Sequence, residues 1–220
     1  MSGIGHMVIA VDGPAASGKG TLSKKLANHF GLARLDTGLI YRAVAMKVLN
    51  DGGELRNKSS VIKAANNISF HDFDRENLRS EGAGIAASKV AVIPEVRRVL
   101  LEFQRNFAAH PPIGKSGVVL DGRDIGTIVC PGANYKIFLI AGPEVRAARR
   151  FKELQEHGSK AIHSRILRDM KDRDDKDSSR SIAPLEPAKD AYVLDTSSLD
   201  ADAAFVAALN YISTQNNGKR

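Results

Sequence analysis

The sequence has 220 residues, 43% of them apolar, which is enough for one domain with a hydrophobic core, or for one that carries a small inserted domain. The single cysteine, Cys130, excludes an internal disulfide and a cysteine-based metal site and suits the reducing cytoplasm, and no apolar run is long enough to span a membrane. The formal net charge of +7 favours anionic partners; because only 5% of residues are aromatic and none is Trp, small phosphorylated molecules are favoured over single-stranded nucleic acid.

The first predicted element is a buried strand over 7–12, an apolar run that stops at Gly-Pro. Leu22, Leu26 and Phe30 then recur every four positions, which indicates a helix, and Gly31 ends it. The chain thus begins with a strand, a glycine-containing loop and a helix. The segment before Met7 is interpreted as a cloning remnant with Met7 as the natural start, and 215–220 as a frayed polar tail.

The rest of the chain alternates between strand and helix patterns. In chain order, the predicted elements are a strand over 32–36, a helix over 39–49, a short helix capped by Ser59, a helix from Pro94 to Pro111, strands over 117–121 and 135–140, a helix from Pro143 to near Gly158, a helix marked by Ile162, Ile166 and Met170, a charged separating segment over 174–187, a strand over 192–195, and a closing helix with Phe205, Leu209 and Ile212 on one face. This alternation predicts an α/β fold with a parallel sheet covered on both faces, in which ligands bind at the carboxyl ends of the strands.

The loop after the first strand has the G-x-x-x-x-G-K spacing of a phosphate-binding loop. It consists of Gly13, Pro14, Ala15, Ala16, Ser17, Gly18, Lys19, Gly20 and Thr21. Its position between a strand and a helix allows the backbone amides to surround phosphate groups at a helix N-terminus, and Lys19 adds a full charge. The alternative is a tight Gly-rich turn with an exposed lysine. Because Gly20 stands where Ser or Thr is usual, a hydroxyl ligand to magnesium is not expected; Gly-Lys-Gly-Thr is instead typical of nucleoside monophosphate kinases.

Two further segments follow predicted strands. Thr37 is expected to cap the helix after the second strand and Arg42 to lie in its first turns, which would make a second anion site, although an ordinary capped helix is the alternative. Asp121, at the end of the third strand, is the residue expected to orient magnesium through water. Arg123 and Asp124 follow it and are expected to project over the ligand, unless this is only a turn with a surface ion pair.

The most highly charged stretch is 165–180, with six basic and five acidic residues. Mixed signs make it a poor patch for a nucleic-acid backbone. A solvated helix end is one interpretation. The other is a mobile lid that brings arginines onto a transferring phosphoryl group.

Five motifs together are similar to those of bacterial-type cytidylate kinases, which belong to the nucleoside monophosphate kinase family. They are the phosphate loop, Asp-Thr-Gly-x-x-Tyr-Arg at 36–42, Ala-Ala-Ser-Lys-Val-Ala-x-Ile-Pro-x-Val-Arg at 86–97, Asp-Gly-Arg-Asp-x-Gly-Thr at 121–127 and Arg-Asp-x-x-Asp-x-x-Arg at 173–180. The resemblance implies a P-loop NTPase-type, five-stranded parallel sheet with helices on both faces. It also implies one kinase domain over 1–220, with a monophosphate-binding insertion over 59–109 and a lid over 173–187.

The resemblance also assigns roles to individual residues. ATP would bind the loop from Gly13 to Thr21, and the catalytic residues would be Lys19, Arg123, Arg173 and Arg180. In CMP binding, Thr37, Arg42, Arg123 and Arg180 would surround the acceptor phosphate, Asp177 with Arg173 would hold the ribose hydroxyls, and Ser88, Arg97 and Asp124 would face the cytosine ring. The stretch over 70–79 is shorter than the family's insertion usually is.

The chemistry of cytosine agrees with this assignment. Its exocyclic amine donates and its ring atoms accept, so a carboxylate such as Asp124 and donors such as Arg97 and Ser88 complement it. Uracil would place an oxygen against the carboxylate, which costs on the order of 1 to 3 kcal/mol when buried. Arg149 or Arg150 is a further candidate for the donor phosphates.

The expected reaction is transfer of the γ-phosphoryl group of ATP, with Mg²⁺, to CMP or dCMP, by a cytoplasmic monomer that binds neither nucleic acid nor membrane. Three alternatives stay open. A GTP-binding switch would need an Asn-Lys-x-Asp motif, which the sequence lacks. A nucleic-acid-associated ATPase would fit the positive net charge. A kinase for another small acceptor, such as UMP or shikimate, is disfavoured only by the cytosine-facing residues.

Overall fold

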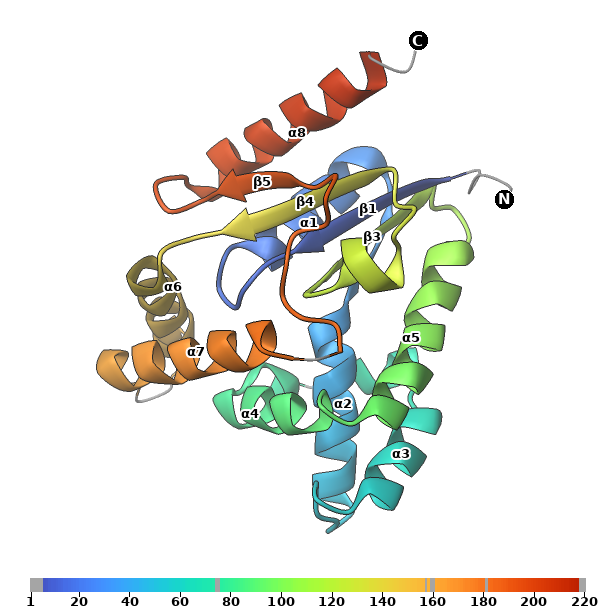
Figure 1. Ribbon diagram of the computed structural model, residues 1–220, viewed down its shortest axis with the longest axis vertical. Coiled ribbons are helices and arrows are strands. Elements are labelled where there is room, and N and C mark those ends of the chain that lie inside the picture. Colours follow the sequence, from blue (N-terminus) through green and yellow to red (C-terminus); the bar gives the residue numbers. More distant parts are fainter. Residues whose placement is uncertain (1–5, 74–75, 157, 159–160, 181, 218–220) are drawn as a thin grey trace. The chain divides into compact units, whose positions relative to one another are not determined.

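A computed structural model describes residues 6–73, 76–156, 158, 161–180 and 182–217 (Figure 1). The predicted N-terminal remnant, apart from His6, and residues 218–220 of the predicted tail lie outside this part of the chain. Two compact units are present. The larger one combines Met1–Leu35 with Pro111–Arg220, and the smaller one is Asp36–His110.

In the part of the chain that the structure describes, five strands form one sheet of order β2-β3-β1-β4-β5. They are β1 (Met7–Asp12), β2 (Ala33–Asp36), β3 (Gly117–Gly122), β4 (Tyr135–Ile140) and β5 (Tyr192–Asp195). β1 lies between β3 and β4 and is parallel to both, and β5 is parallel to β4. The predicted α/β fold with a five-stranded parallel sheet is therefore confirmed. In such a sheet the strands' carboxyl ends meet at one edge, and the loops that follow β1 and β3 lie there.

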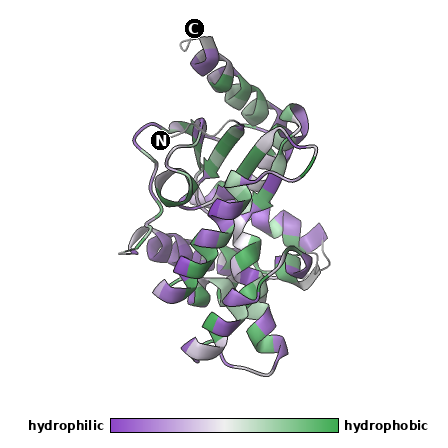
Figure 2. Cartoon of the chain, turned by 90° about the vertical axis from the view of Figure 1, so that its right-hand side faces the viewer, coloured by the Kyte–Doolittle hydropathy of each residue, from purple (hydrophilic) through white to green (hydrophobic). Residues whose placement is uncertain are grey.

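The described residues of the larger unit also form four α-helices. They are α1 (Lys19–Phe30), α6 (Pro143–Glu156), α7 (His163–Ser178) and α8 (Ala201–Asn217). One face of the sheet packs on α1 and α8 around Ile9, Leu26 and Ile212, which are almost fully buried. The helices show both hydrophobic and hydrophilic residues (Figure 2), as expected for helices with one side in the core. No helix among the described residues is long and apolar enough to cross a membrane.

The local signals for α1 are borne out by its ends. Gly18 precedes it with φ 92°, and Gly31 follows it with φ 67° and donates its N–H to the carbonyl of Ala27. Both backbone conformations favour glycine because they are left-handed. Gly31 therefore ends the helix as predicted.

Helix α7 is longer than the sequence pattern suggested. It begins at His163 and continues to Ser178, so the first part of the predicted separating segment is helical. Most of its charged residues are exposed or half-buried, with Asp177 buried, while Ile166 and Met170 pack with α6. The prediction that this helix ends before the charged segment over 174–187 was therefore wrong.

The smaller unit is helical in its described residues. Its elements are α2 (Thr37–Asn50), α3 (Lys58–Asn66), α4 (Glu81–Val90), α5 (Pro94–Ala109) and the 3₁₀ turns η1 (Phe70–Phe73) and η2 (Glu76–Arg79). Phe70 packs against Phe103 and Phe107 with ring centroids 5.0 and 5.8 Å apart. Helix α4 and both 3₁₀ turns were not predicted.

The predicted caps of α2 and α3 were each wrong by one or two residues. Asp36, not Thr37, precedes α2, and its carboxylate accepts the N–H of Leu39 at 3.3 Å. Asn57, not Ser59, caps α3 by accepting the N–H of Ser60 at 3.2 Å. Asp and Asn are both good caps, and each stands where its oxygen reaches an otherwise unpaired amide.

Candidate functional site

The loop between β1 and α1 has the backbone geometry of a phosphate cradle. Gly13, Ala16 and Gly18 all have positive φ values, of 142°, 56° and 92°. A Cβ atom on Gly13 would lie 2.2 Å from the carbonyl oxygen of Leu139, so only glycine fits. The left-handed turns let successive amides face the same side, and the loop leads directly into the N-terminus of α1, where the helix dipole favours an anion.

Two polar side chains in this loop are buried. Lys19, 7% exposed, is the first residue of α1, and its ammonium donates to the carbonyl oxygen of Pro14 at 2.5 Å. The buried hydroxyl of Ser17 has no hydrogen-bond partner among the described residues. A buried polar atom without a partner is costly, so this arrangement suits a loop that is completed by a ligand.

Asp12 is a site residue that the sequence analysis missed. Its carboxylate accepts the N–H of Ile125 at 2.8 Å and that of Gly126 at 2.7 Å. These amides open η3 (Ile125–Val129), a π-helical turn after β3. Asp12 therefore links the end of β1, next to the phosphate loop, to the turn that follows Asp124. The side chain of Asp124 is also buried.

The environment of Asp12 changes its acidity. Burial raises the pKa of Asp12 to about 6, against the opposing effect of the two backbone N–H groups. The negative charge of Asp124 raises the pKa further, and the positive charge of Lys19 lowers it. A π-helical turn and a buried carboxylate of raised pKa are both features found at functional sites.

Asp121 lies near the end of β3, as predicted, but it has a partner that the sequence did not reveal. Nε and Nη2 of Arg34 lie 3.0 and 2.9 Å from its Oδ2. Arg34 belongs to β2, the strand next to β3 in the sheet. The sequence predicts a short strand over 32–36 but not that this strand neighbours β3, so the pair could not be anticipated.

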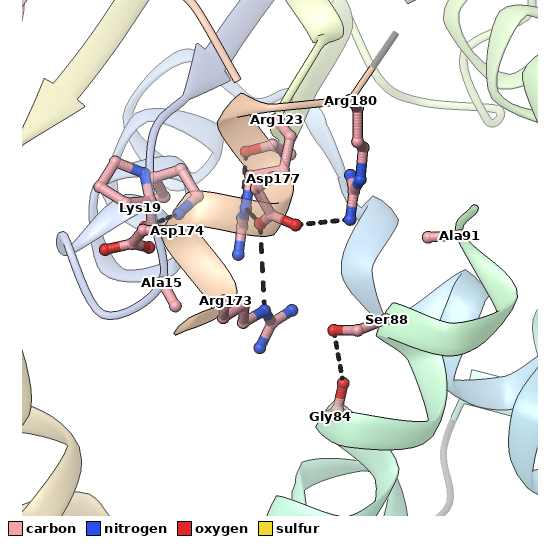
Figure 3. Close-up of polar contacts among 12 residues, drawn as sticks. Ala15, Lys19, Gly84, Ser88, Ala91, Arg123, Arg173, Asp174, Asp177 and Arg180 are labelled. Carbon is pink, nitrogen blue, oxygen red and sulfur yellow. Dashed lines mark hydrogen bonds and ion pairs between the residues drawn. The ribbon is translucent and has the colours of Figure 1, made fainter. Parts of the chain in front are cut away.

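Three of the predicted arginines converge on one carboxylate, that of Asp177 (Figure 3). Arg123 donates from Nε to Oδ2 at 3.0 Å, Arg180 donates from Nη2 to Oδ1 at 2.5 Å, and Nε of Arg173 lies 4.0 Å from Oδ2. The side chain of Asp177 is 2% exposed. The structure thus brings together four predicted residues from the loop after β3 and the end of α7.

The charges of the surrounding arginines determine whether the carboxyl group of Asp177 is protonated. Burial alone would raise the pKa of Asp177, but the positive charges of Arg123, Arg180 and Arg173 together lower it. The carboxylate is therefore ionised and holds the arginines as cations. The buried Nε of Arg180 has no hydrogen-bond acceptor among the described residues, so this arginine retains a donor that an anion could use.

Another arginine missed by the sequence analysis, Arg146, links α6 to the phosphate loop. It donates to the carbonyl of Ala15 at 3.2 Å and pairs with Asp174 at 2.5 Å. Of the two further candidates for the donor phosphates, Arg149 donates to Thr196 and Leu199 in the loop after β5. Arg150 forms an ion pair with Glu153 on its own helix.

The predicted residues of the smaller unit lie on three of its helices. Thr37 is buried at the start of α2, and Arg42, on the same helix, donates to the carbonyl of Leu78 at 2.9 Å. Ser88 of α4 donates to the carbonyl of Gly84 at 3.2 Å (Figure 3). Arg97 of α5 donates to the carbonyl of Ala91 at 3.4 Å and lies 5.8 Å from the centre of the Tyr41 ring.

Comparison with known proteins identifies the family. The sequence model of the cytidylate kinase family matches residues 9–214. The chain is 56% identical over 208 residues to the cytidylate kinase of Paramagnetospirillum magneticum, covering 94% of this chain and 98% of that protein. It is 51% identical over 214 residues to the cytidylate kinase of Methylocella silvestris, covering 97% of each.

Among solved structures, an uncharacterized protein from Eubacterium ventriosum aligns with a TM-score of 0.56, covering 95% of this chain and 99% of that one. Its sequence identity is 14%, so this likeness concerns the fold. The resemblance carried by the five sequence motifs is confirmed by the family match and by the two relatives. The chain belongs to the cytidylate kinase family.

Proposed function

We propose that this protein transfers the γ-phosphoryl group of ATP to the 5′-phosphate of CMP or dCMP, giving ADP and CDP or dCDP. The observation that carries the proposal is the presence, in one compact unit, of a phosphate-binding loop and of three arginines gathered on Asp177. The first suits the donor nucleotide and the second suits a phosphoryl group in transfer. Membership of the cytidylate kinase family supports the choice of acceptor.

The chemistry requires no protein nucleophile or strong base because the acceptor phosphate oxygen is already anionic. The protein must position two nucleotides and neutralise charge. Lys19 and the amides of the loop carry this out on the donor phosphates. Arg123, Arg173 and Arg180, held by Asp177, carry it out on the transferring group and on the acceptor.

Magnesium fits this site as a companion of ATP rather than as an ion caged by protein. Among the described residues no three His, Cys, Asp or Glu side chains are grouped to hold a metal. Asp121, at the carboxyl end of β3, supplies a carboxylate that suits hydrogen bonding to metal-bound water. When bound, Mg²⁺ would neutralise phosphate charge, and the other ligands would be phosphate oxygens and water.

We assign CMP binding to three groups of residues. Thr37, Arg42, Arg123 and Arg180 are proposed to bind the acceptor phosphate, Arg173 and Asp177 the ribose, and Ser88, Arg97 and Asp124 the cytosine. A carboxylate has about four acceptor sites, so Asp177 can accept a ribose hydroxyl while it holds arginines. We further propose that 59–109 is the monophosphate-binding insertion and that 173–187, which starts within α7, is the lid.

A coupled assay of ADP release tests the proposal. It uses ATP with Mg²⁺ and a panel of acceptors: CMP, dCMP, UMP, AMP, GMP and shikimate. CMP and dCMP are expected to give the highest kcat/KM. Turnover of another acceptor with CMP inactive would overturn the assignment. In a separate measurement, light scattering of the protein is expected to give the molar mass of a monomer.

Asp124→Ala tests how the base is recognised. Removing a buried carboxylate that accepts from the cytosine amine is expected to lower the ratio of kcat/KM for CMP over UMP roughly tenfold, which corresponds to about 1.4 kcal/mol. Asp169→Ala, at a half-buried position of α7, is the control and is expected to leave the ratio unchanged. An unaltered ratio in Asp124→Ala would refute the assignment.

A further inference from the structure

Arg34 has no role in the function described so far, yet it contacts the residue proposed to orient magnesium. Two of its nitrogens approach the same oxygen of Asp121, Oδ2, at 3.0 and 2.9 Å. The side chain of Asp121 is 6% exposed and that of Arg34 is 25% exposed. One oxygen of this nearly buried carboxylate is therefore engaged by a guanidinium group.

The same guanidinium group also lies beside the phosphate loop. A Cβ atom on Gly20 would lie 3.2 Å from Nη2 of Arg34. Gly20 follows Lys19 at the position where a Ser or Thr side chain commonly holds the metal in phosphate loops. In this chain the space next to that position is taken by a cation that comes from β2.

We propose that Arg34 is a positioning residue that holds Asp121 while no metal is bound, and that Mg²⁺ carried by the nucleotide competes with Arg34 for this carboxylate. The inference rests on the proposed function, because it takes Asp121 to be the partner of metal-bound water. Two cations that share one carboxylate oppose each other, so Arg34 reduces the gain in nucleotide affinity that Mg²⁺ provides. In the absence of metal, the charge of Arg34 beside the loop favours binding of the phosphates.

A purely structural ion pair would behave differently. Its loss would affect the folded protein as a whole and would change nucleotide affinity equally with and without metal. Competition predicts a loss of nucleotide affinity in the absence of metal and no loss in its presence. The measurable quantity is therefore the ratio of the ADP dissociation constant in EDTA to that in saturating Mg²⁺.

Calorimetric titration with ADP measures this ratio in the wild-type protein and in Arg34→Met, which keeps an apolar side chain of similar length. The ratio is expected to rise about tenfold in Arg34→Met, through weaker binding in EDTA and undiminished binding with Mg²⁺. Lys25→Met also removes one cation from an ion pair of the larger unit, at a partly exposed position, and is expected to leave the ratio unchanged. A ratio in Arg34→Met within about twofold of the wild-type ratio would overturn the inference.

Two further variants separate the possible failures. Arg34→Lys keeps the charge without the two-nitrogen contact, so a ratio between those of the wild type and Arg34→Met is expected, and this variant replaces Arg34→Met if the latter does not fold. Asp121→Asn is expected to reduce the effect of Mg²⁺. If Asp121→Asn leaves the effect of Mg²⁺ on ADP affinity intact, the proposed role of Asp121 is wrong. If Asp121→Asn reduces this effect while neither Arg34 variant alters it, only the inference on Arg34 is wrong.

Discussion

Lys19 carries the full positive charge of the phosphate loop, and its ammonium is held against the loop by the carbonyl of Pro14. Lys19→Met keeps the length of the side chain but removes the charge that neutralises the transferring phosphoryl group. We expect kcat to fall at least about a hundredfold, on the scale of a lost charge-stabilising donor. The same coupled assay measures this loss, and the melting temperature is expected to stay close to that of the wild type.

Lys24→Met provides a matched control for Lys19→Met, because Lys24 lies on the same helix but is exposed. It should turn over normally. Near-normal turnover in Lys19→Met as well would remove the loop lysine from the mechanism.

Asp12 makes the stability of the protein depend on pH. Its pKa is raised from 3.8 to about 6 in the folded state, so between these values the folded protein retains a proton that the unfolded chain has released. The resulting stabilisation is present at low pH and is lost as the pH rises through about 6. From about pH 5 to about pH 8, the wild-type free energy of unfolding, relative to that of Asp12→Asn, is expected to fall by about 1 kcal/mol.

Urea unfolding of both proteins at the two pH values measures this difference. Asp169→Asn, whose carboxylate is paired with Arg165 and only half-buried, serves as the reference and is expected to show no such trend against the wild type. A pH-independent difference between the wild type and Asp12→Asn would contradict the raised pKa.

At the scale of elements, Asp177 joins the end of α7 to the loop after β3. Asp177→Asn removes the negative charge that faces Arg123, Arg173 and Arg180, while it keeps the shape of the side chain. Uncompensated cations at this nearly buried position are expected to lower the free energy of unfolding by on the order of 3 kcal/mol. Urea unfolding near neutral pH measures the effect, and Asp169→Asn on the same helix should change little because its ion pair is exposed.

The acid dependence gives a second test of this cluster. Because the folded-state pKa of Asp177 is lowered, its stabilising contribution is complete above the ordinary carboxyl value of 3.8 and is lost only as the pH falls through the lowered pKa. Asp177→Asn should therefore lose less stability than the wild type on strong acidification. Equal acid sensitivity would show that the arginines do not depend on this charge.

Several elements could be predicted because their signals are local. The apolar runs of β1, β4 and β5 gave the bounds that the structure shows, since each is a short run next to turn residues. Helix α4 was missed because Gly82 and Gly84 weaken helix propensity and its buried side chains are mostly alanines. It is held by the Ser80 cap and by burial of residues such as Val90, and burial depends on packing.

At the scale of the whole molecule, the net charge of +7 left open a nucleic-acid-associated ATPase. The larger unit uses many of its cations within the fold: Arg34, Arg123 and Arg146 are all engaged by buried or partly buried carboxylates. We therefore expect double-stranded DNA and polycytidylate to change ATP hydrolysis by less than about twofold at physiological salt. Filter binding and the hydrolysis assay check this. Strong stimulation of ATP hydrolysis by either polymer would support a nucleic-acid-associated ATPase instead.

The sequence by itself determined the phosphate loop, the strand before it, the helix after it and the family. These follow from neighbouring residues, because a turn that needs glycine and a strand that needs a continuous apolar run are both written in consecutive positions. The Arg-Asp-x-x-Asp-x-x-Arg motif was also recognised from consecutive positions, although only the structure shows Arg173 and Asp177 on adjacent turns of α7 and Arg180 just after its end.

Only the tertiary structure decided which charges meet. Asp12 reaches the amides of Ile125 and Gly126, and Arg34 reaches Asp121, across long stretches of chain, because the strand order places β3 between β2 and β1. No local pattern encodes that order, since it depends on the packing of the complete sheet. The raised pKa of Asp12 and the pairing of Asp121 with Arg34 both follow from these long-range contacts.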